Sequence, residues 1–202
     1  MVSEGQFRTK AFAEQGDFVL DDAYAVCAVT GRGGGKTRSG ALKLLRYVTE
    51  YPGSLVMVTA PSFPLLRDST YLMVKEVWPG PLTEHFHPSS MELQVPNGSV
   101  VLFRSTDNPD LLRGPNLAAA WMDEAAYSPE RAFEVLIGGV RDERYPPQIW
   151  LTTTPNGFNW VYQEFVKKEN VDYRLHHWTI DANTHLTEVQ KRQMKAKYTD
   201  EF

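Results

Sequence analysis

A lysine and a threonine at the end of a glycine-rich stretch have the residue types and spacing needed to bind nucleotide phosphates. The stretch AVCAVTGRGGGKTRSG runs from Ala25 to Gly40 and contains the pair Lys36 and Thr37. In phosphate-binding loops the lysine reaches the β- and γ-phosphates and the hydroxyl ligates Mg²⁺. Glycines let backbone N–H groups approach the phosphates closely. We therefore predict an ATP and Mg²⁺ site whose loop residues are Thr30, Gly31, Arg32, Gly33, Gly34, Gly35, Lys36 and Thr37.

The loop departs from the usual pattern at its first position. The pattern G-x-x-x-x-G-K-[ST] places a glycine at position 30, where this chain has Thr30. A threonine there requires a less extreme backbone angle than a glycine could adopt. The alternative interpretation is a glycine-rich turn without a ligand. That alternative predicts no lysine–hydroxyl pair at the start of a helix and no matching motifs elsewhere.

Two adjacent acids follow an apolar run at 117–126, LAAAWMDEAA. A nucleotide-bound Mg²⁺ needs a carboxylate at the carboxyl end of a buried strand, where ligands bind in open α/β sheets. Asp123 suits that role through metal-bound water. Glu124 could orient and polarise an attacking water as a general base, because the chain turns at a strand end. The alternative is a solvated acidic pair at the start of a loop.

Three threonines, 152–154, end a further apolar run, PQIWLTTTPNG at 147–157. In additional-strand P-loop ATPases this strand lies between the two other motif strands, so its tip would face the γ-phosphate. Hydroxyls at the tip, Thr154 among them, could hydrogen-bond the phosphate or the water and report whether the phosphate is present. The alternative is that these threonines are ordinary strand formers.

Arginines supply the last candidate group, because a guanidinium can stabilise the charge that develops during phosphoryl transfer. Arg141 and Arg144 lie in GGVRDERYPP, a Gly- and Pro-bounded loop suited to reaching a neighbouring subunit in trans. Taken singly, each arginine is more typical of a solvated surface. The other candidates are Arg32, Arg104 and Arg113.

Apolar runs and helical periodicities alternate along the chain and must position these residues. This alternation predicts a three-layer α/β fold with a mostly parallel central sheet, as in P-loop NTPases of the additional-strand, RecA-like class. A hairpin is predicted around Asn97–Gly98 within 91–105. Thr187 and Gln190 fit a capping box at the start of the last helix. The predicted strands are 23–30, 54–60, 117–126, 147–157 and 173–180, and the predicted helices are 36–50, 65–78, 129–137, 159–169 and 187–198.

Composition sets the broad class of protein. The 202 residues are 42% hydrophobic and 23% charged with a net charge of −4, which predicts one ordinary globular domain, 1–202, and no globally basic surface. Cys27 is the only cysteine, so no intrachain disulfide can form. No apolar stretch approaches membrane-spanning length, so no membrane partner is expected. The histidines at 85–87 and 176–177 lack metal-ligand partners at usable spacing.

With these motifs in place, the chain resembles the ATPase domain of the large terminase subunit, the genome-packaging motor of tailed bacteriophages. Members of that family often lack the first glycine of the loop and carry an arginine four residues before the lysine, as Arg32 precedes Lys36. Segment 103–126 looks like their approach to the acidic strand, 150–160 is similar to their coupling motif, and 181–202 resembles the stretch before their nuclease domain. The adenine-side motif has no clear match, although Gln6, Phe7 and Gln15 could contact the base.

The resemblance implies a wider setting for the chain. It implies a homo-oligomeric ring that hydrolyses ATP and translocates double-stranded DNA into a procapsid, with the portal protein and the small terminase subunit as partners. It implies a location in the cytoplasm of the infected bacterial host, transiently at the procapsid portal and not in the mature virion. It also implies a longer native protein with a C-terminal nuclease domain, and the stop directly after a helix is what we expect of a domain cut from a longer chain. No nuclease carboxylate cluster is visible in the sequence, so DNA cleavage is not assigned to this chain.

Two alternatives remain open at the level of sequence. One is another nucleic-acid translocase, such as a helicase core, although a helicase needs a second RecA-like lobe. The other is a non-hydrolysing, nucleotide-gated interaction module, in which Glu124 would be irrelevant to turnover.

Overall fold

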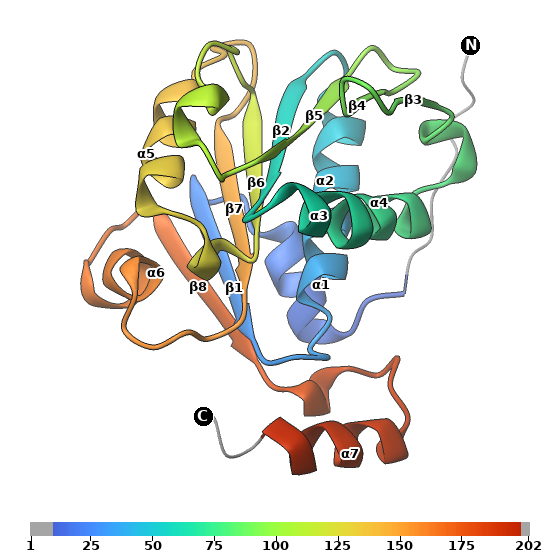
Figure 1. The fold of residues 1–202 in the computed structure, drawn as a ribbon, viewed down its shortest axis with the longest axis vertical. Helices are drawn as coiled ribbons and strands as arrows, with labels where there is room; N and C mark the ends of the chain where they lie inside the picture. Colours follow the sequence, from blue (N-terminus) through green and yellow to red (C-terminus); the bar gives the residue numbers. More distant parts are fainter. Residues whose placement is uncertain (1–9, 199–202) are drawn as a thin grey trace.

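A central sheet of eight strands carries helices on both of its faces (Figure 1). The computed structural model describes residues 10–198. The strands lie in the order β3-β4-β5-β2-β6-β7-β1-β8. The six strands from β5 to β8 in this order pair in parallel, and β3 and β4 add an antiparallel edge. The prediction of a three-layer α/β fold with a mostly parallel sheet is confirmed.

The helices and strands have the following bounds. The strands are β1 Ala25–Thr30, β2 Leu55–Ala60, β3 His85–His87, β4 Glu92–Gln94, β5 Val100–Ser105, β6 Ala119–Asp123, β7 Gln148–Thr153 and β8 Tyr173–Trp178. The α-helices are α1 Ala13–Leu20, α2 Lys36–Glu50, α3 Phe63–Leu65, α4 Leu72–Val77, α5 Glu130–Gly139, α6 Trp160–Tyr162 and α7 Glu188–Tyr198. Two π-helical segments, η1 Leu66–Tyr71 and η5 Gln163–Lys167, continue α3 and α6.

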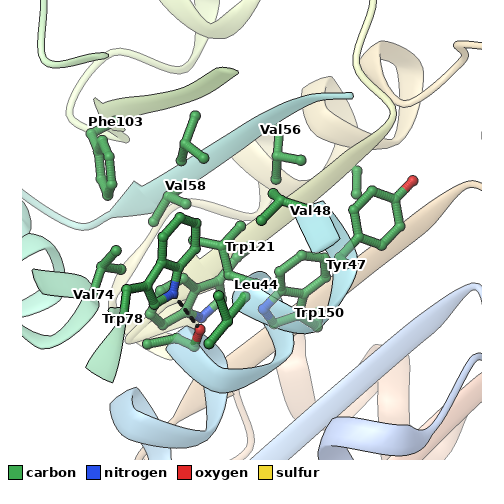
Figure 2. Close-up of a cluster of buried hydrophobic side chains, with 14 of the residues drawn as sticks. Leu44, Tyr47, Val48, Val56, Val58, Val74, Trp78, Phe103, Trp121 and Trp150 are labelled. Atoms are coloured by element: carbon green, nitrogen blue, oxygen red, sulfur yellow. Dashed lines mark hydrogen bonds between the residues drawn. The ribbon is translucent and has the colours of Figure 1, made fainter. Parts of the chain in front are cut away.

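Two apolar cores fill the space between the sheet and its two helical layers. The first core packs α2 and α4 against the central strands and contains the fully buried Trp121 and Trp150 (Figure 2). Gly40 of α2 lies directly on Trp121, since a Cβ there would be 2.3 Å from the indole ring. This close approach seats α2, and therefore its first residue Lys36, against β6.

The strand order brings the three motif strands to the centre of the sheet. β7 lies between β6 and β1, as the additional-strand class requires. All three strands are parallel, so their carboxyl ends meet at one edge. The loops after β1, β6 and β7 touch one another at that edge, through Lys36, Glu124 and Thr154, and we call this edge the crevice because ligands bind there in open α/β sheets.

The structure corrects the predicted elements at several points. The strand predicted for 117–126 ends at Asp123, because Glu124 adopts a left-handed backbone conformation with φ 50° and ψ 43°. The predicted helix over 65–78 is interrupted by the π-helical η1. α1 and the edge strand β3 were not predicted. Within residues 10–198, no helix combines the length and the apolar character that crossing a bilayer requires.

Candidate nucleotide-binding site

The loop between β1 and α2 forms a tight turn at the crevice. Thr30 ends β1, and α2 begins at Lys36, so the loop has the strand-before, helix-after context of a phosphate site. Gly33 and Gly35 have φ values of 77° and 80°, which favour glycine. The turn places the amino end of a 15-residue helix, with its unpaired N–H groups, at the carboxyl edge of the sheet.

Side chains from outside the loop hold the carbonyl groups of residues 33–35. Asn183 Nδ2 donates to the first carbonyl at 2.6 Å, Trp178 Nε1 to the second at 2.6 Å, and Gln15 Nε2 to the third at 3.1 Å. Each of these bonds occupies a carbonyl oxygen and so fixes the orientation of a loop peptide. Gln15, one of the candidates for contact with adenine, donates to the loop in this structure, and its contact with a base stays a prediction; Gln6 and Phe7 lie outside the described residues.

The irregular first residue of the loop is complementary to one of its glycines. Thr30 is fully buried at the end of a regular strand, and its hydroxyl has no hydrogen-bond partner among the described residues. A Cβ on Gly34 would lie 1.9 Å from the Thr30 hydroxyl oxygen. The threonine side chain therefore fills the space beside residue 34, and only glycine leaves room for it there.

Asp123 is buried among three threonine hydroxyls. Its Oδ1 accepts from Thr152 at 2.7 Å and from Thr37 at 3.3 Å, and its Oδ2 accepts from Thr70 at 2.8 Å. Burial raises the pKa of the Asp123 carboxyl to about 6, and the hydrogen bonds from Thr152 and Thr70 act in the opposite direction. The sequence predicted the neighbourhood of Thr37 and Asp123 but not the contribution of Thr70.

Glu124 faces the same crevice although it follows Asp123 directly. Its left-handed backbone turns the chain out of the strand, which is an uncommon conformation for a residue with a side chain. Its Oε1 pairs with Lys36 Nζ at 3.0 Å, and its Oε2 accepts from the backbone N–H and the hydroxyl of Thr154, both at 3.4 Å. One carboxylate thus bridges the lysine of the loop and the tip of β7.

The three threonines at the end of β7 divide between two surroundings. Thr152 contacts Asp123 and Thr154 contacts Glu124, whereas Thr153 accepts a hydrogen bond from the backbone N–H of Ala126 at 3.0 Å. This alternation follows the period-two geometry of a strand. The structure therefore places Thr152 and Thr154 in the site, and leaves Thr153 outside it.

Comparison with known proteins identifies the family. The family model of the phage terminase large subunit matches residues 23–201. The chain belongs to the phage terminase large subunit family. The PBSX phage terminase large subunit of Bacillus subtilis (strain 168) is 29% identical over an alignment 191 residues long, and the match covers 82% of this chain and 44% of that protein. This terminase chain therefore spans less than half the length of that relative.

Solved terminase structures share the fold of the chain. The ATPase domain of the Thermus phage P74-26 large terminase superposes with a TM-score of 0.73 at 21% identity, covering 96% of this chain and 89% of that one. A large terminase from a thermophilic bacteriophage gives a TM-score of 0.78 at 16% identity, covering 96% of this chain and 51% of that one. At these identities the likeness shows the fold.

The oxygen donors in this terminase fit a magnesium ion. Among the described residues no group of three His, Cys, Asp or Glu side chains is placed to hold a metal. The Thr37 hydroxyl and the Asp123 carboxylate nevertheless lie 3.3 Å apart at the start of α2. Mg²⁺ is usually bound by one or two protein oxygens together with substrate phosphates and water. The pair therefore suits an ion that arrives with the nucleotide.

The candidate trans arginines of the terminase chain lie at the other end of the sheet. Arg141 follows α5, and its Nε bonds Asn116 Oδ1 at 3.3 Å. Its backbone N–H bonds the carbonyl of Leu117, which precedes β6. Leu117 and Asp123 are six residue steps apart, which is roughly 20 Å in strand geometry. Arg141 therefore does not reach the phosphate loop of its own chain.

Other candidate arginines are engaged within the chain. Arg144 makes two bonds to the Asp142 carboxylate, at 2.9 and 2.7 Å. Arg104 pairs with Glu92 at 3.0 Å in the β4–β5 hairpin, and Arg113 pairs with Asp110 at 2.9 Å. Arg32 lies in the phosphate loop itself and lines a pocket together with Trp178, Ile180 and Met194.

Proposed function

We propose that this chain is the ATP-hydrolysing motor domain of a phage genome-packaging terminase. One observation carries the proposal: the Lys36–Glu124 pair at 3.0 Å joins the phosphate loop to the acidic end of β6. A cation that binds phosphate and a carboxylate that activates water must both lie within contact distance of the γ-phosphate. The structures of the large terminase from the thermophilic bacteriophage in complex with ADP and with ATP-γ-S support nucleotide as the ligand class.

The geometry suggests an order of events at the site. In the structure Lys36 Nζ forms an ion pair with Glu124 Oε1. When ATP binds, the oxygens of its γ-phosphate would attract the lysine away from Glu124. Glu124 would then hold a water in line with the γ-phosphorus. As the water oxygen bonds to phosphorus, its proton passes to Glu124 and the bond to the bridging oxygen of ADP breaks. When bound, Mg²⁺ would neutralise charge on the β- and γ-phosphates beside Thr37 and Asp123.

The tip of β7 offers a route from hydrolysis to movement. Thr154 touches Glu124 through both its N–H and its hydroxyl at 3.4 Å, so a shift of the glutamate would change both contacts. The next residue, Pro155, begins the loop that leads to α6. A change at Glu124 on binding or loss of the γ-phosphate would thus move the end of β7 and the surface loop that follows it.

The family also suggests the setting in which the domain works. We infer translocation of double-stranded DNA by a homo-oligomeric ring, with the portal protein, the small terminase subunit and a nuclease domain of the same full-length protein as partners. The corresponding location is the cytoplasm of the infected bacterium and, transiently, the procapsid portal. The family match and the length of the Bacillus subtilis relative support this inference.

Substitution of Glu124 by glutamine tests the hydrolytic role. The amide keeps the shape of the side chain and removes its basicity, so ATP turnover in the assembled motor should fall by about 10²–10⁴-fold while nucleotide binding persists. Turnover is measured as phosphate release at saturating ATP. A rate within about threefold of wild type would overturn the catalytic assignment and favour a nucleotide-gated module that does not hydrolyse ATP.

Mixed rings test whether Arg141 or Arg144 acts in trans. Subunits with Arg141→Ala or Arg144→Ala are combined with Glu124→Gln subunits, and phosphate release is measured across mixing ratios. An arginine supplied by a neighbour is worth about 10³–10⁵ in rate. Only a trans arginine should restore activity in the mixture, because some interfaces then join an intact Glu124 to an intact arginine. Absence of rescue with both variants would exclude the two residues as fingers.

A further inference from the structure

Thr70 lies on an unusual piece of helix beside the site. The helix after β2 begins as α3 and ends as α4, and its middle, η1, is π-helical. Such segments change which side chains face inward and frequently occur at functional sites. Here the segment turns Thr70, fully buried, toward the end of β6, where its hydroxyl donates to Asp123 Oδ2 at 2.8 Å.

The two oxygens of Asp123 are held from different directions. Thr152 accepts a hydrogen bond from Trp121 Nε1 at 2.8 Å, so its own proton is directed to Oδ1 of the aspartate. Thr37, the other partner of Oδ1, is a residue that would turn to the metal. Within residues 10–198, Thr70 is the hydrogen-bond partner of Oδ2. Without Thr70 this buried oxygen would have no donor from that part of the chain.

We propose that Thr70 is a positioning residue for the magnesium site, acting through Asp123. The terminal torsion of an aspartate is broad, so one hydrogen-bonded oxygen does not fix the carboxylate plane. The bonds to Thr152 and Thr70 fix both oxygens and thereby the direction in which Asp123 presents its lone pairs to the water shell of the ion. Partners of metal-ligating carboxylates commonly contribute about 10–100-fold to metal affinity. The inference rests on the proposed nucleotide site.

A matched set of variants tests whether Thr70 positions Asp123 for the metal or only supplies a hydrogen bond that a buried carboxylate needs for stability. Thr70→Val removes the hydroxyl and keeps the shape, whereas Thr70→Ser keeps the hydroxyl. Thr106→Val is the control, because Thr106 is equally buried and its hydroxyl bonds Ser128 at 2.8 Å, outside the site. Binding of a fluorescent N-methylanthraniloyl ADP to the 202-residue chain is followed first in EDTA and then during titration with Mg²⁺.

The expected result is specific to the metal. Thr70→Val should raise the Mg²⁺ concentration at half-saturation about tenfold, while affinity in EDTA changes by less than about twofold. Thr70→Ser and Thr106→Val should stay within about threefold of wild type. The proposal is overturned if Thr70→Val behaves like Thr106→Val, if Thr70→Ser shares the defect, or if affinity in EDTA falls equally. Should Thr70→Val fail to fold, Thr70→Ala is read by the same criteria.

Failure of the proposed function gives a different result in the same experiment. If the wild-type chain binds the probe neither in EDTA nor with Mg²⁺, the nucleotide site itself is wrong. If the wild type binds the probe with a clear Mg²⁺ dependence that Thr70→Val leaves unchanged, the nucleotide site stands and only the role of Thr70 is lost.

Discussion

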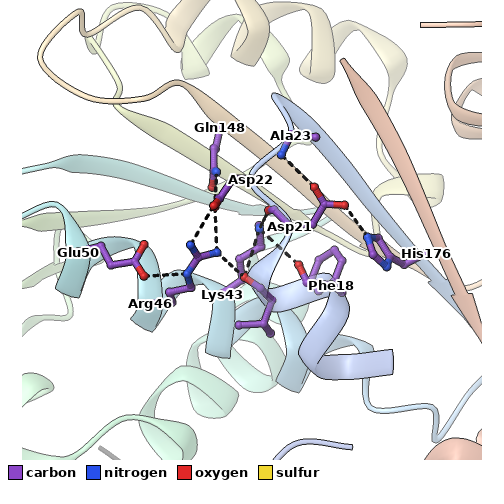
Figure 3. A network of polar contacts seen from close by, with 10 residues as sticks. Phe18, Asp21, Asp22, Ala23, Lys43, Arg46, Glu50, Gln148 and His176 are labelled. Carbon is purple, nitrogen blue, oxygen red and sulfur yellow. Dashed lines mark hydrogen bonds and ion pairs between the residues drawn. The ribbon is translucent and has the colours of Figure 1, made fainter. Parts of the chain in front are cut away.

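Two lysines on the same helix show how differently a buried cation can be used. Lys36 and Lys43 lie seven residues apart on α2, about two turns, and are 9% and 1% exposed. Lys43 is surrounded by the carbonyl oxygens that end α1 and lead into β1 (Figure 3). Lys36 has a carboxylate, Glu124, as its partner at the mouth of the crevice. The acceptors of Lys43 are the carbonyl oxygens of Phe18, Val19 and Asp21.

The difference lies in whether the partners can be exchanged. The backbone carbonyls at the end of α1 cannot move away while the helix stays folded. Lys43 therefore keeps these acceptors and links α1 to α2. Burial lowers the pKa of Lys43 to about 8. Around it Arg46 binds Asp22 and Glu50, so the neighbouring charges are also paired. Lys36 instead holds a single side chain that a phosphate can displace. Burial alone therefore does not distinguish the two lysines, but the type of partner does.

The largest expected difference between the two lysines is in the affinity for ATP. Lys36→Ala removes the cation that meets the phosphates, and we expect binding of ATP to weaken by about 100-fold, the loss of a charge-assisted contact of about 2.7 kcal/mol. Lys43→Met should leave the affinity of the folded chain within about threefold. Calorimetric titration with ATP and Mg²⁺ measures both. Normal binding by Lys36→Ala would show that the loop is not a phosphate site.

The stability of wild type and Lys43→Met should differ in its pH dependence. The pKa of Lys43 is about 8 in the folded state and near its ordinary value of 10.5 when unfolded, so the unfolded chain binds more protons between these values. The wild-type free energy of unfolding should therefore rise with pH relative to Lys43→Met, by about 2 kcal/mol between roughly pH 7.5 and roughly pH 9.5.

Urea unfolding of both chains at the two pH values measures this difference. A parallel pH dependence in wild type and Lys43→Met would contradict the depressed pKa of the lysine. Since both chains keep the other titrating groups, including Tyr47 with its raised pKa, those contributions cancel in the comparison.

The smallest expected effect concerns the backbone carbonyls of the phosphate loop. These carbonyls accept hydrogen bonds from neutral side chains, whereas the carbonyls at the end of α1 accept from the charged Lys43. Asn183→Ala removes the 2.6 Å bond to the carbonyl of Gly33. A neutral hydrogen bond contributes about 1 kcal/mol net, so ATP affinity should fall roughly fivefold. Asn97→Ala is a suitable control, because the side-chain amide of Asn97 also donates to a backbone carbonyl, that of Val48 at 2.7 Å, near the opposite end of α2 from the phosphate loop. Equal affinity for both variants would mean that the loop keeps its shape without this support.

Most of the sheet could be predicted from sequence because its central strands are continuous apolar runs. The capping box of α7 was also predicted and is confirmed, with Thr187 N–H and Gln190 Oε1 at 2.9 Å. α1 escaped prediction because its eight residues include Gly16 and lack a side-chain N-cap. β3 is three residues long and forms an edge, too short for an alternation to be read. The prediction that the strand at 117–126 continues past Asp123 was wrong, because Glu124 has a left-handed backbone conformation. The pattern of apolar residues does not indicate that conformation.

The site was predictable where neighbours in sequence carry the chemistry. Lys36 with Thr37, and Asp123 with Glu124, are adjacent pairs, and the strand order brings the two pairs together. Their roles in turnover remain predictions. The contact between Thr70 and Asp123 could not be predicted, because Thr70 lies 53 residues before Asp123. It depends on a π-helical turn, which the spacing of apolar residues in the sequence does not indicate. The donors to the loop carbonyls are likewise single side chains from distant elements.

The position of the only cysteine has a practical consequence for attaching fluorophores to this chain. Cys27 lies fully buried in the centre of β1, and burial raises the pKa of its thiol, so the thiolate that maleimides attack is suppressed. A cysteine introduced at an exposed position of this chain would be the reactive one. Fluorophore pairs for distance measurements during ATP turnover can therefore be attached without first replacing a residue of the core.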